Sequence, residues 1–228
     1  MIKNLEKKVS KYHKKFDKVS GYAVPNETVF RLLGNSNFNS KNKKILDIGI
    51  GHGDNLLEFC RRGGITFGID IREKILNSFI KKNKQEPKNY FHCDLNQDFP
   101  KINEKMDLVL CKDTIYYLKL ERQFILFDEI NKILKKNGFI LFQYIQAQLK
   151  STSKNFFSFN LGTKSSFHNM EHYMDKENPL PFLKNQHIKK LVNNKNFKIK
   201  KNIFDLNIHT KDNKTIYTIN RFILLQKK

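Results

Sequence analysis

Residues 45–55 read ILDIGIGHGDN, and the fold expected for the whole chain follows from this segment. Its first part is a short β-prone apolar run, and an amphipathic helical pattern follows over 54–62. Gly49, Gly51 and Gly53 stand between the two. Glycines at such a turn let the backbone bend sharply and let a ligand lie against the main chain. The pattern therefore predicts a ligand-binding turn, with an ordinary glycine-rich turn as the alternative.

The spacing of the glycines also distinguishes between ligands. A dinucleotide fingerprint, G-x-G-x-x-G, would need Gly or Ala at position 54, where this chain has Asp54. A carboxylate at the start of that helix would repel a pyrophosphate. No G-K-[ST] follows, so the phosphate-binding P-loop is absent as well. The turn thus lacks both nucleotide-binding motifs.

Strand-like and helix-like segments alternate from residue 44 to residue 145, and this alternation predicts a layered α/β sheet. The run over 139–145 is almost entirely apolar, which is typical of a strand buried on both faces of a parallel sheet. We expect the helix over 121–136 to carry Lys135 and Lys136 in its last turn and to stop at Asn137 and Gly138. The expected strands are 44–50, 65–70, 90–94, 106–113 and 139–145, and the expected helices are 25–33, 54–62, 72–82 and 121–136.

The beginning of the chain has a helical pattern of its own. Apolar residues recur at spacings of three and four over 2–16, the period of one helix face. We therefore predict an N-terminal helical cap over residues 1–40, which covers the mouth of the site, and a main domain over 41–228.

The alternation breaks after residue 145. Residues 146–184 show little periodicity, and a connection of that length inside a compact domain is usually functional or disordered. We predict that it is a lid-like insertion, with an incidental surface loop as the alternative. A helix around Leu191 follows, and then two strand-like runs over 197–210 and 214–226, which the turn-like residues 211–213 join into an antiparallel hairpin.

The motif D-x-G-x-G-x-G, here Asp47, Gly49, Gly51 and Gly53, resembles the first motif of class I S-adenosylmethionine-dependent methyltransferases. The resemblance implies a Rossmann-like, doubly wound, mostly parallel sheet of seven strands, here with a C-terminal antiparallel hairpin and an N-terminal helical cap. In that family an acidic residue at the end of the second strand binds both ribose hydroxyls, a place that Asp70 takes here. A carboxylate can accept two hydrogen bonds from a diol. A solvated aspartate at a strand end is the alternative.

Two later segments also match the family. FHCDLNQDF at 91–99 is similar to the segment whose aspartate accepts from the adenine amino group, which maps onto Asp94 with Leu95 beside it. MDLVLCKDTIYYL at 106–118 resembles the fourth strand and the loop that faces the methyl donor. The resemblance thus implies S-adenosylmethionine as the cofactor, bound by Asp47, Gly49, Gly51, Gly53, Asp70, Ile71, Asp94, Leu95 and Lys112.

The resemblance leaves the catalytic residues open. Methyl transfer needs in-line placement of a nucleophile, and a base where that nucleophile is a hydroxyl. Many members carry His where this chain has Tyr117, whose hydroxyl is a poor proton acceptor near neutrality. The candidates are Tyr117 and, in the predicted lid, His168 and His172. The two histidines, with Glu171, could instead hold a metal, but a lone histidine pair is weak evidence and no metal is expected.

Composition narrows the range of partners. The 228 residues carry a net charge of +21, which invites a nucleic-acid partner. Of the 43 basic residues only six are Arg, the side chain that phosphate recognition prefers, and the lysines are spread over the whole length. A dispersed lysine coat is more often a solvated surface than a binding face, so nucleic acid is possible but not favoured.

The cellular setting is also an expectation from composition. Mean hydropathy is −0.59, and no apolar run approaches the ~20 residues that a membrane-spanning helix needs. The opening residues lack the apolar core of a secretory signal. Three cysteines are too few and too odd in number for a disulfide framework. A cytoplasmic protein without a membrane span is expected, and the oligomeric state is not indicated.

The sequence therefore favours methyl transfer from S-adenosylmethionine to an O or N atom of a small-molecule acceptor, such as a sugar or another biosynthetic precursor. An RNA methyltransferase is the first alternative, although no [DN]-P-P-[FYW] follows the fourth strand and no Pro-Cys pair is present. A non-catalytic binding protein on the same fold is the second. Intact cofactor motifs count against it.

Overall fold

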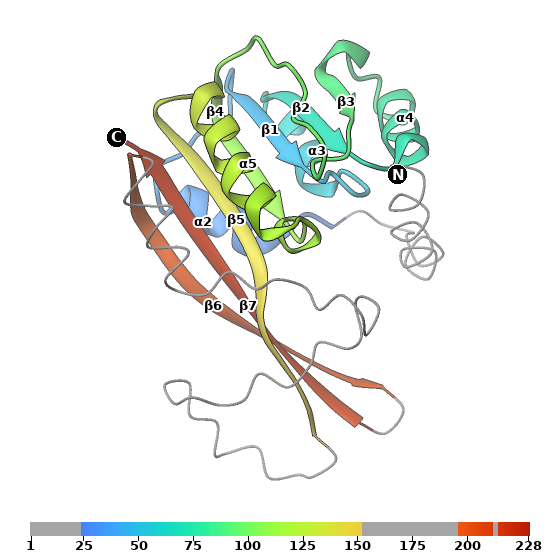
Figure 1. Ribbon diagram of the computed structural model, residues 1–228, viewed down its shortest axis with the longest axis vertical. Coiled ribbons are helices and arrows are strands. Elements are labelled where there is room, and N and C mark those ends of the chain that lie inside the picture. Colours follow the sequence, from blue (N-terminus) through green and yellow to red (C-terminus); the bar gives the residue numbers. More distant parts are fainter. Residues whose placement is uncertain (1–23, 152–195, 212–213) are drawn as a thin grey trace.

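The computed structural model describes residues 24–151, 196–211 and 214–228 (Figure 1). Within these residues seven strands form a single sheet in the order β3-β2-β1-β4-β5-β7-β6. Strands β3 to β5 of that order pair in parallel, whereas β7 pairs antiparallel with both β5 and β6. The strands are β1 (Lys44–Ile48), β2 (Ile65–Asp70), β3 (Tyr90–His92), β4 (Met106–Lys112), β5 (Leu134–Ser151), β6 (Phe197–Lys211) and β7 (Lys214–Lys227). The mostly parallel sheet with a C-terminal antiparallel hairpin is confirmed.

Helices cover both faces of this sheet, so it is doubly wound, as predicted. They are α2 (Glu27–Gly34), α3 (Asp54–Arg61), α4 (Glu73–Lys82) and α5 (Leu120–Ile133), with 3₁₀ turns η1 (Pro87–Asn89) and η2 (Ile115–Tyr117). Side chains alternate along β1: Leu46 packs in the core beneath α5, and Ile45 packs beneath α2 and α3. None of the described helices is both long and apolar enough to cross a bilayer.

The first described helix belongs to this core. Asn26 caps α2 by accepting a hydrogen bond from the Val29 amide over 3.1 Å. Val29, Leu32 and Leu33 are buried in one cluster with residues of the sheet. The predicted helix over 2–16 lies outside the described residues, and the division into a cap and a main domain stays a prediction.

The prediction for the end of α5 was wrong. The helix ends at Ile133, and Leu134 already pairs with Met106 of β4 as the first residue of β5. Lys227, which lies in β7, donates to the carbonyl of Asn131 in the last turn of α5 and to the carbonyl of Leu134, the first residue of β5, and so satisfies one of the unpaired carbonyls at the end of the helix. Because this cap comes from a remote strand, the local sequence does not contain it.

The residues after α5 accordingly belong to the strand. Lys135 and Lys136, predicted in the last helical turn, lie in β5, as do the predicted stop residues Asn137 and Gly138. Asn137 takes a left-handed φ of 62°, and the pairing with β4 shifts register between Leu134 and Phe139. The stop signal therefore marks an irregularity within β5.

Strand β5 also continues further than predicted. Residues 146–151, expected at the start of the lid-like insertion, pair with β7 as far as Ser151 opposite Thr215. Figure 1 shows β5, β6 and β7 reaching well beyond the other strands. The rest of the predicted insertion and the predicted helix around Leu191 lie outside the described residues. The expected strand over 90–94 is shorter, because the turn after β3 begins at Asp94, whose carbonyl accepts from Gln97.

Asp107 ties three strands together at the amino-terminal edge of the sheet. Its Oδ2 accepts hydrogen bonds from the Lys44 amide over 2.9 Å and from Lys135 Nζ over 2.8 Å. Burial alone would raise the pKa of Asp107, but the bonds from Lys135 and Lys44 outweigh it and hold the pKa below its ordinary value. The charged carboxylate therefore stabilises this edge.

Replacing Asp107 by asparagine should lower the free energy of unfolding at pH 7 by about 1 kcal/mol, because one charged hydrogen-bond acceptor is lost. A lowered pKa means that the stabilisation is present above pH 3.8, the ordinary value for Asp, and is lost as the pH falls through the folded-state pKa. Urea denaturation should thus show a larger difference between wild type and Asp107→Asn at pH 7 than at pH 3. As a control, Glu129→Gln, which breaks a solvent-exposed pair with Lys132, should change stability by less than Asp107→Asn does; equal effects of the two variants would contradict the prediction.

Candidate functional site

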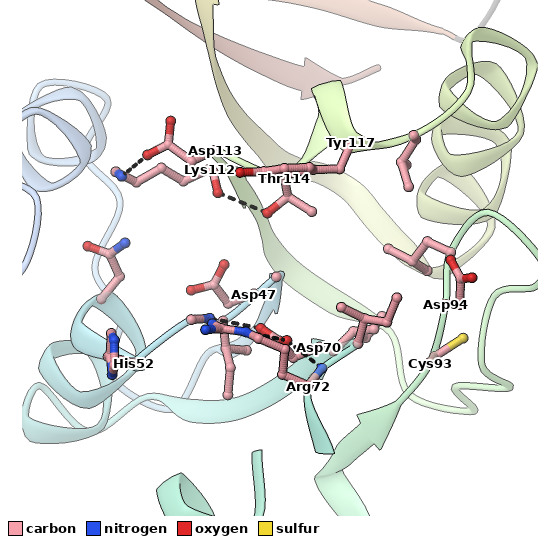
Figure 2. Close-up of a pocket in the computed structure, with 18 of the residues that line it drawn as sticks. Asp47, His52, Asp70, Arg72, Cys93, Asp94, Lys112, Asp113, Thr114 and Tyr117 are labelled. Carbon is pink, nitrogen blue, oxygen red and sulfur yellow. Dashed lines mark hydrogen bonds and ion pairs between the residues drawn. The ribbon is translucent and has the colours of Figure 1, made fainter. Parts of the chain in front are cut away.

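A crevice opens at the carboxyl ends of β1, β2, β3 and β4, where the strand order reverses between β1 and β4 (Figure 2). Open α/β sheets bind ligands at this point because the connecting loops diverge there. The cavity measures about 260 Å³ and is lined from all four strand ends. Every one of these strand ends carries at least one aspartate.

The turn between β1 and α3 forms the floor of the crevice. Gly51 faces the cavity, and a Cβ added to it would meet nothing nearer than Arg72 Nη2 at 3.8 Å. Gly53 has a different role: it has a φ of 80°, and a Cβ there would lie 2.1 Å from the Phe79 ring. Gly53 thus lets α3 begin against α4, while Gly51 leaves room for a ligand.

Asp70 connects the ends of β1 and β2. Its side chain is 5% exposed, and its Oδ2 accepts a hydrogen bond from the Gly51 amide over 3.0 Å. Its Oδ1 accepts from the Arg72 amide over 2.8 Å and, at a longer 3.4 Å, from Arg72 Nε. A carboxylate offers about four lone pairs. Asp70 can therefore accept a further bond from a ligand, and a second one if the long Arg72 contact gives way.

Asp47 is a buried carboxylate with an unused oxygen. The residue is 3% exposed, and its Oδ1 is shielded from solvent without any hydrogen-bond partner. Burial raises the pKa of Asp47 to about 7; the charge of Lys112 opposes this shift, and the charges of Asp70 and Asp54 add to it. A buried polar group without a partner is costly, so this oxygen suits a cationic or hydrogen-donating ligand group.

Asp54, in the first turn of α3, is a second carboxylate with an unused oxygen. Its Oδ1 is likewise buried without a partner. Burial raises the pKa of Asp54, and the charges of His52 and Lys112 oppose that shift. Two carboxylates on the same side of the crevice therefore favour positive charge.

The opposite end of the crevice is formed after β2 and β3. Asp94 is 5% exposed and accepts hydrogen bonds from the Asn96 amide over 2.9 Å and from Gln97 Nε2 over 3.1 Å. Leu95 and Ile71 add apolar lining to the crevice. This end therefore combines one fixed carboxylate with apolar walls.

The loop after β4 closes the crevice from above in Figure 2. Lys112 Nζ pairs with the Asp113 carboxylate, and the Thr114 hydroxyl donates to the Lys112 carbonyl over 3.0 Å. Thr114 also packs against Gly49, where an added Cβ would lie 2.0 Å from its Oγ1. Tyr117, at the end of η2, lines the cavity as well.

The structure brings most of the predicted site residues to this one cavity: Asp47, Gly49, Gly51, Asp70, Ile71, Asp94, Leu95, Lys112 and Tyr117. Gly53 lies at the start of α3, outside the lining. His168 and His172 lie outside the described residues. Within those residues no group of three or more His, Cys, Asp or Glu side chains could hold a metal ion.

Sequence reasoning missed Arg72, Asn55 and Thr114, which also line the cavity. A signal existed for Arg72, because an aspartate commonly accepts a hydrogen bond from the backbone two residues on. No local signal existed for Asn55 or Thr114, whose places depend on the packing of α3 and of the β4 loop. The charged lining residues are five aspartates and two cations: Asp47, Asp54, Asp70, Asp94, Asp113, Arg72 and Lys112.

Comparison with known proteins agrees with this geometry. Residues 46–142 match the family model described as "Methyltransferase domain". A phosphoethanolamine N-methyltransferase of Plasmodium falciparum is 29% identical over 153 residues, which cover 65% of this chain and 56% of that protein. The chain thus spans just over half the length of this relative.

Solved structures show a similar fold. An S-adenosylmethionine-dependent methyltransferase from Clostridium acetobutylicum superposes with a TM-score of 0.63 at 16% identity, over 96% of this chain and 97% of that one. Magnesium protoporphyrin IX methyltransferase from Synechocystis PCC 6803, solved with bound SAM, gives 0.55 at 15% identity, over 98% and 84%. Identities this low show the likeness of fold alone.

Replacing Asp47 by asparagine should stabilise the ligand-free protein at pH 8. The pKa of Asp47 is about 7 in the folded protein, raised from 3.8. The free energy of unfolding therefore falls as the pH rises from 3.8 to 7, because the native state must then bury a charge. We expect D47N to raise the free energy of unfolding by about 1 to 3 kcal/mol at pH 8 and to make little difference at pH 4. Thermal unfolding at both pH values measures this, and a variant less stable than wild type at pH 8 would contradict it.

Proposed function

We propose that this chain, whose residues 46–142 match the methyltransferase-domain model, is a class I S-adenosylmethionine-dependent methyltransferase that transfers the methyl group to an O or N atom of a small-molecule acceptor. The observation that carries the proposal is the Asp70 carboxylate, held at the centre of an acidic crevice with hydrogen-bonding capacity to spare.

The described residues fit the cofactor along its whole length. Asp70 is placed to accept from the ribose diol, using the free lone pair of Oδ2 and the position of the long Arg72 contact. On one side Asp94 and Leu95 offer an acceptor and an apolar wall to the purine. On the other side the unpartnered oxygen of Asp47 suits the ammonium group, and Lys112 suits the carboxylate.

Charge supports the same fit. S-adenosylmethionine carries a sulfonium and an ammonium against a single carboxylate, so it is a net cation. The lining of the crevice has more carboxylates than cations. Burial in a low-dielectric crevice strengthens that attraction.

The bound cofactor supplies the electrophilic methyl group, and the residues of the chain orient the reactants and exclude water. The loop after β4 lines the crevice with Asp113 and Tyr117, so it can contact an acceptor that enters the crevice. Tyr117, His168 and His172 stay the proposed catalytic residues.

An amine nitrogen is the favoured acceptor atom. An acidic crevice attracts a protonated amine, and the carboxylate of Asp113 lies at its rim. The named activity of the Plasmodium relative, an N-methyltransferase, supports the same choice. An RNA acceptor is disfavoured, because a polyanion would meet the same aspartates.

Replacing Asp70 by asparagine should weaken binding of S-adenosylhomocysteine, the demethylated cofactor, by about tenfold to a hundredfold, because a charged acceptor of hydrogen bonds becomes a neutral one. Isothermal titration calorimetry measures the effect. Asp98→Asn, at an exposed aspartate outside the cavity lining, is the control and should bind like wild type. Equal affinities of D70N and wild type would contradict the assignment of Asp70 to the ribose. If the wild-type protein does not bind S-adenosylhomocysteine, the alternative of a non-catalytic protein on the same fold is favoured.

Transfer of a labelled methyl group from S-adenosylmethionine should modify a small amine in a panel that includes phosphoethanolamine and ethanolamine, and should not modify total RNA. The physical reason is the acidic lining, which favours cations over polyanions. Incorporation is counted after separating small molecules from RNA. Label found only in RNA would sink the small-molecule proposal, and label found only in hydroxyl acceptors would sink the preference for nitrogen.

A further inference from the structure

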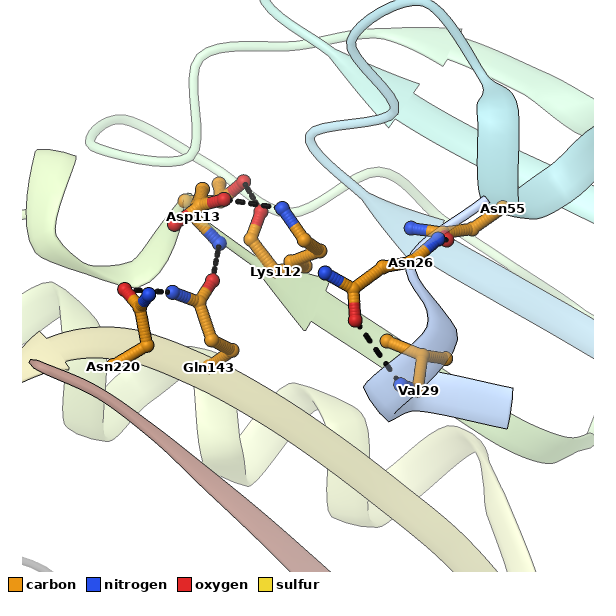
Figure 3. A network of polar contacts seen from close by, with 8 residues as sticks. Asn26, Val29, Asn55, Lys112, Asp113, Gln143 and Asn220 are labelled. Atoms are coloured by element: carbon orange, nitrogen blue, oxygen red, sulfur yellow. Dashed lines mark hydrogen bonds and ion pairs between the residues drawn. The ribbon is translucent and has the colours of Figure 1, made fainter. Parts of the chain in front are cut away.

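A hydrogen-bonded pair of buried amides, Gln143 on β5 and Asn220 on β7, lies behind the turn that follows β4 (Figure 3). Gln143 Nε2 donates to Asn220 Oδ1 over 2.9 Å, and the two residues are 2% and 8% exposed. Their neighbours along the same sheet face, Leu141 and Phe222, are apolar and buried. Buried amides cost free energy relative to apolar side chains unless their bonds are satisfied. The sheet therefore gains nothing from this pair by packing alone.

The pair continues into the turn after β4. The backbone amide of Asp113 donates to Gln143 Oε1 over 3.0 Å and lies 3.3 Å from the Gln143 carbonyl oxygen. Asp113 has a left-handed φ of 54°, a conformation that costs free energy for any residue with a Cβ. The two acceptors on Gln143 hold the Asp113 amide in the direction that this conformation gives it.

The conformation of this turn also determines where an ion pair lies. Asp113 and Lys112 form an ion pair, and both line the crevice. The charge of Lys112 acts on Asp47 and Asp54, which lie on the glycine-turn side. A chain of contacts thus runs from Asn220 through Gln143 and Asp113 to Lys112.

We propose that Gln143 and Asn220 are positioning residues, which hold the Lys112–Asp113 pair against the amino-acid end of the cofactor. This inference rests on the proposed function, in which Asp70 takes the ribose. Asp70 divides the crevice, with Asp94 on the purine side and Lys112 on the other. The amide pair therefore acts on one end of the cofactor only.

Because only one end of the cofactor should be affected, ligands with and without that end can test the inference. S-adenosylhomocysteine has the amino-acid end, whereas 5′-methylthioadenosine has the same adenosine and sulfur without it. Gln143→Met keeps the length of the side chain but removes the side-chain acceptor for Asp113 and the donor to Asn220, whereas the backbone carbonyl near the Asp113 amide remains. By calorimetry we expect Q143M to bind S-adenosylhomocysteine about tenfold more weakly than wild type and 5′-methylthioadenosine within about twofold.

A second variant tests whether the two amides act as one unit. Asn220→Leu removes the acceptor for Gln143 Nε2 and should weaken S-adenosylhomocysteine binding in the same direction but by less. In the Q143M background N220L should add nothing, because the link is already broken. Additive losses of affinity in the double variant would contradict the inference that Asn220 acts through Gln143.

Tyr144→Phe is the matched control. Tyr144 is the next residue on β5, faces the opposite side of the sheet and has a buried hydroxyl that accepts from Arg221 Nη1 over 3.2 Å. Y144F should bind both ligands like wild type. Equal loss of both ligands in Q143M, or loss of neither, would overturn the inference while the proposed function stands, because 5′-methylthioadenosine binding reports separately on the fold. Wild type that binds neither ligand would contradict the proposed function itself.

Discussion

The crevice depends on the hydrogen bond from the Gly51 amide to the Asp70 carboxylate. It joins the turn after β1 to the end of β2, so the two halves of the floor keep a fixed distance. Gly51 supplies this amide from a left-handed backbone conformation with a φ of 55°, and Asp70 is buried at the end of its strand instead of being solvated. The same carboxylate also accepts from the Arg72 amide, which fixes the start of α4. One buried acceptor thereby organises three segments around the crevice.

The charge of the crevice contrasts with the charge of the chain. A net charge of +21 invites a nucleic-acid partner, yet the described lining has five aspartates against two cations. Net charge is a property of the whole surface, whereas recognition depends on the few groups that a ligand displaces from water. The carboxylates gather because the carboxyl ends of neighbouring parallel strands meet at one edge of the sheet. Amino-acid composition cannot reveal this clustering of carboxylates, because it does not specify where the residues lie in the fold.

The C-terminal strands show how remote contacts override local signals. Lys135, Lys136, Asn137 and Gly138 have the order that usually ends a helix, but the helix ends earlier. Lys227 of β7 satisfies the Asn131 carbonyl in the last turn of the helix, and Asp107 draws Lys135 into the edge of the sheet. Each of these partners lies 28 or more positions away from its target in the chain. A helix end with such partners cannot be located from its own residues.

The parallel sheet, the glycine turn and the aspartates at three strand ends can be predicted from the amino-acid sequence, because each depends on local periodicity or on residues within one strand-turn-helix unit. The packing role of Gly53, the exposure of Gly51 to the cavity and the contacts of Gln143 with Asp113 and Asn220 become visible only in the folded chain. Those roles depend on which strands become neighbours and on the register between them. Strand order and register follow from the burial of the whole core, and no single stretch of sequence contains that information.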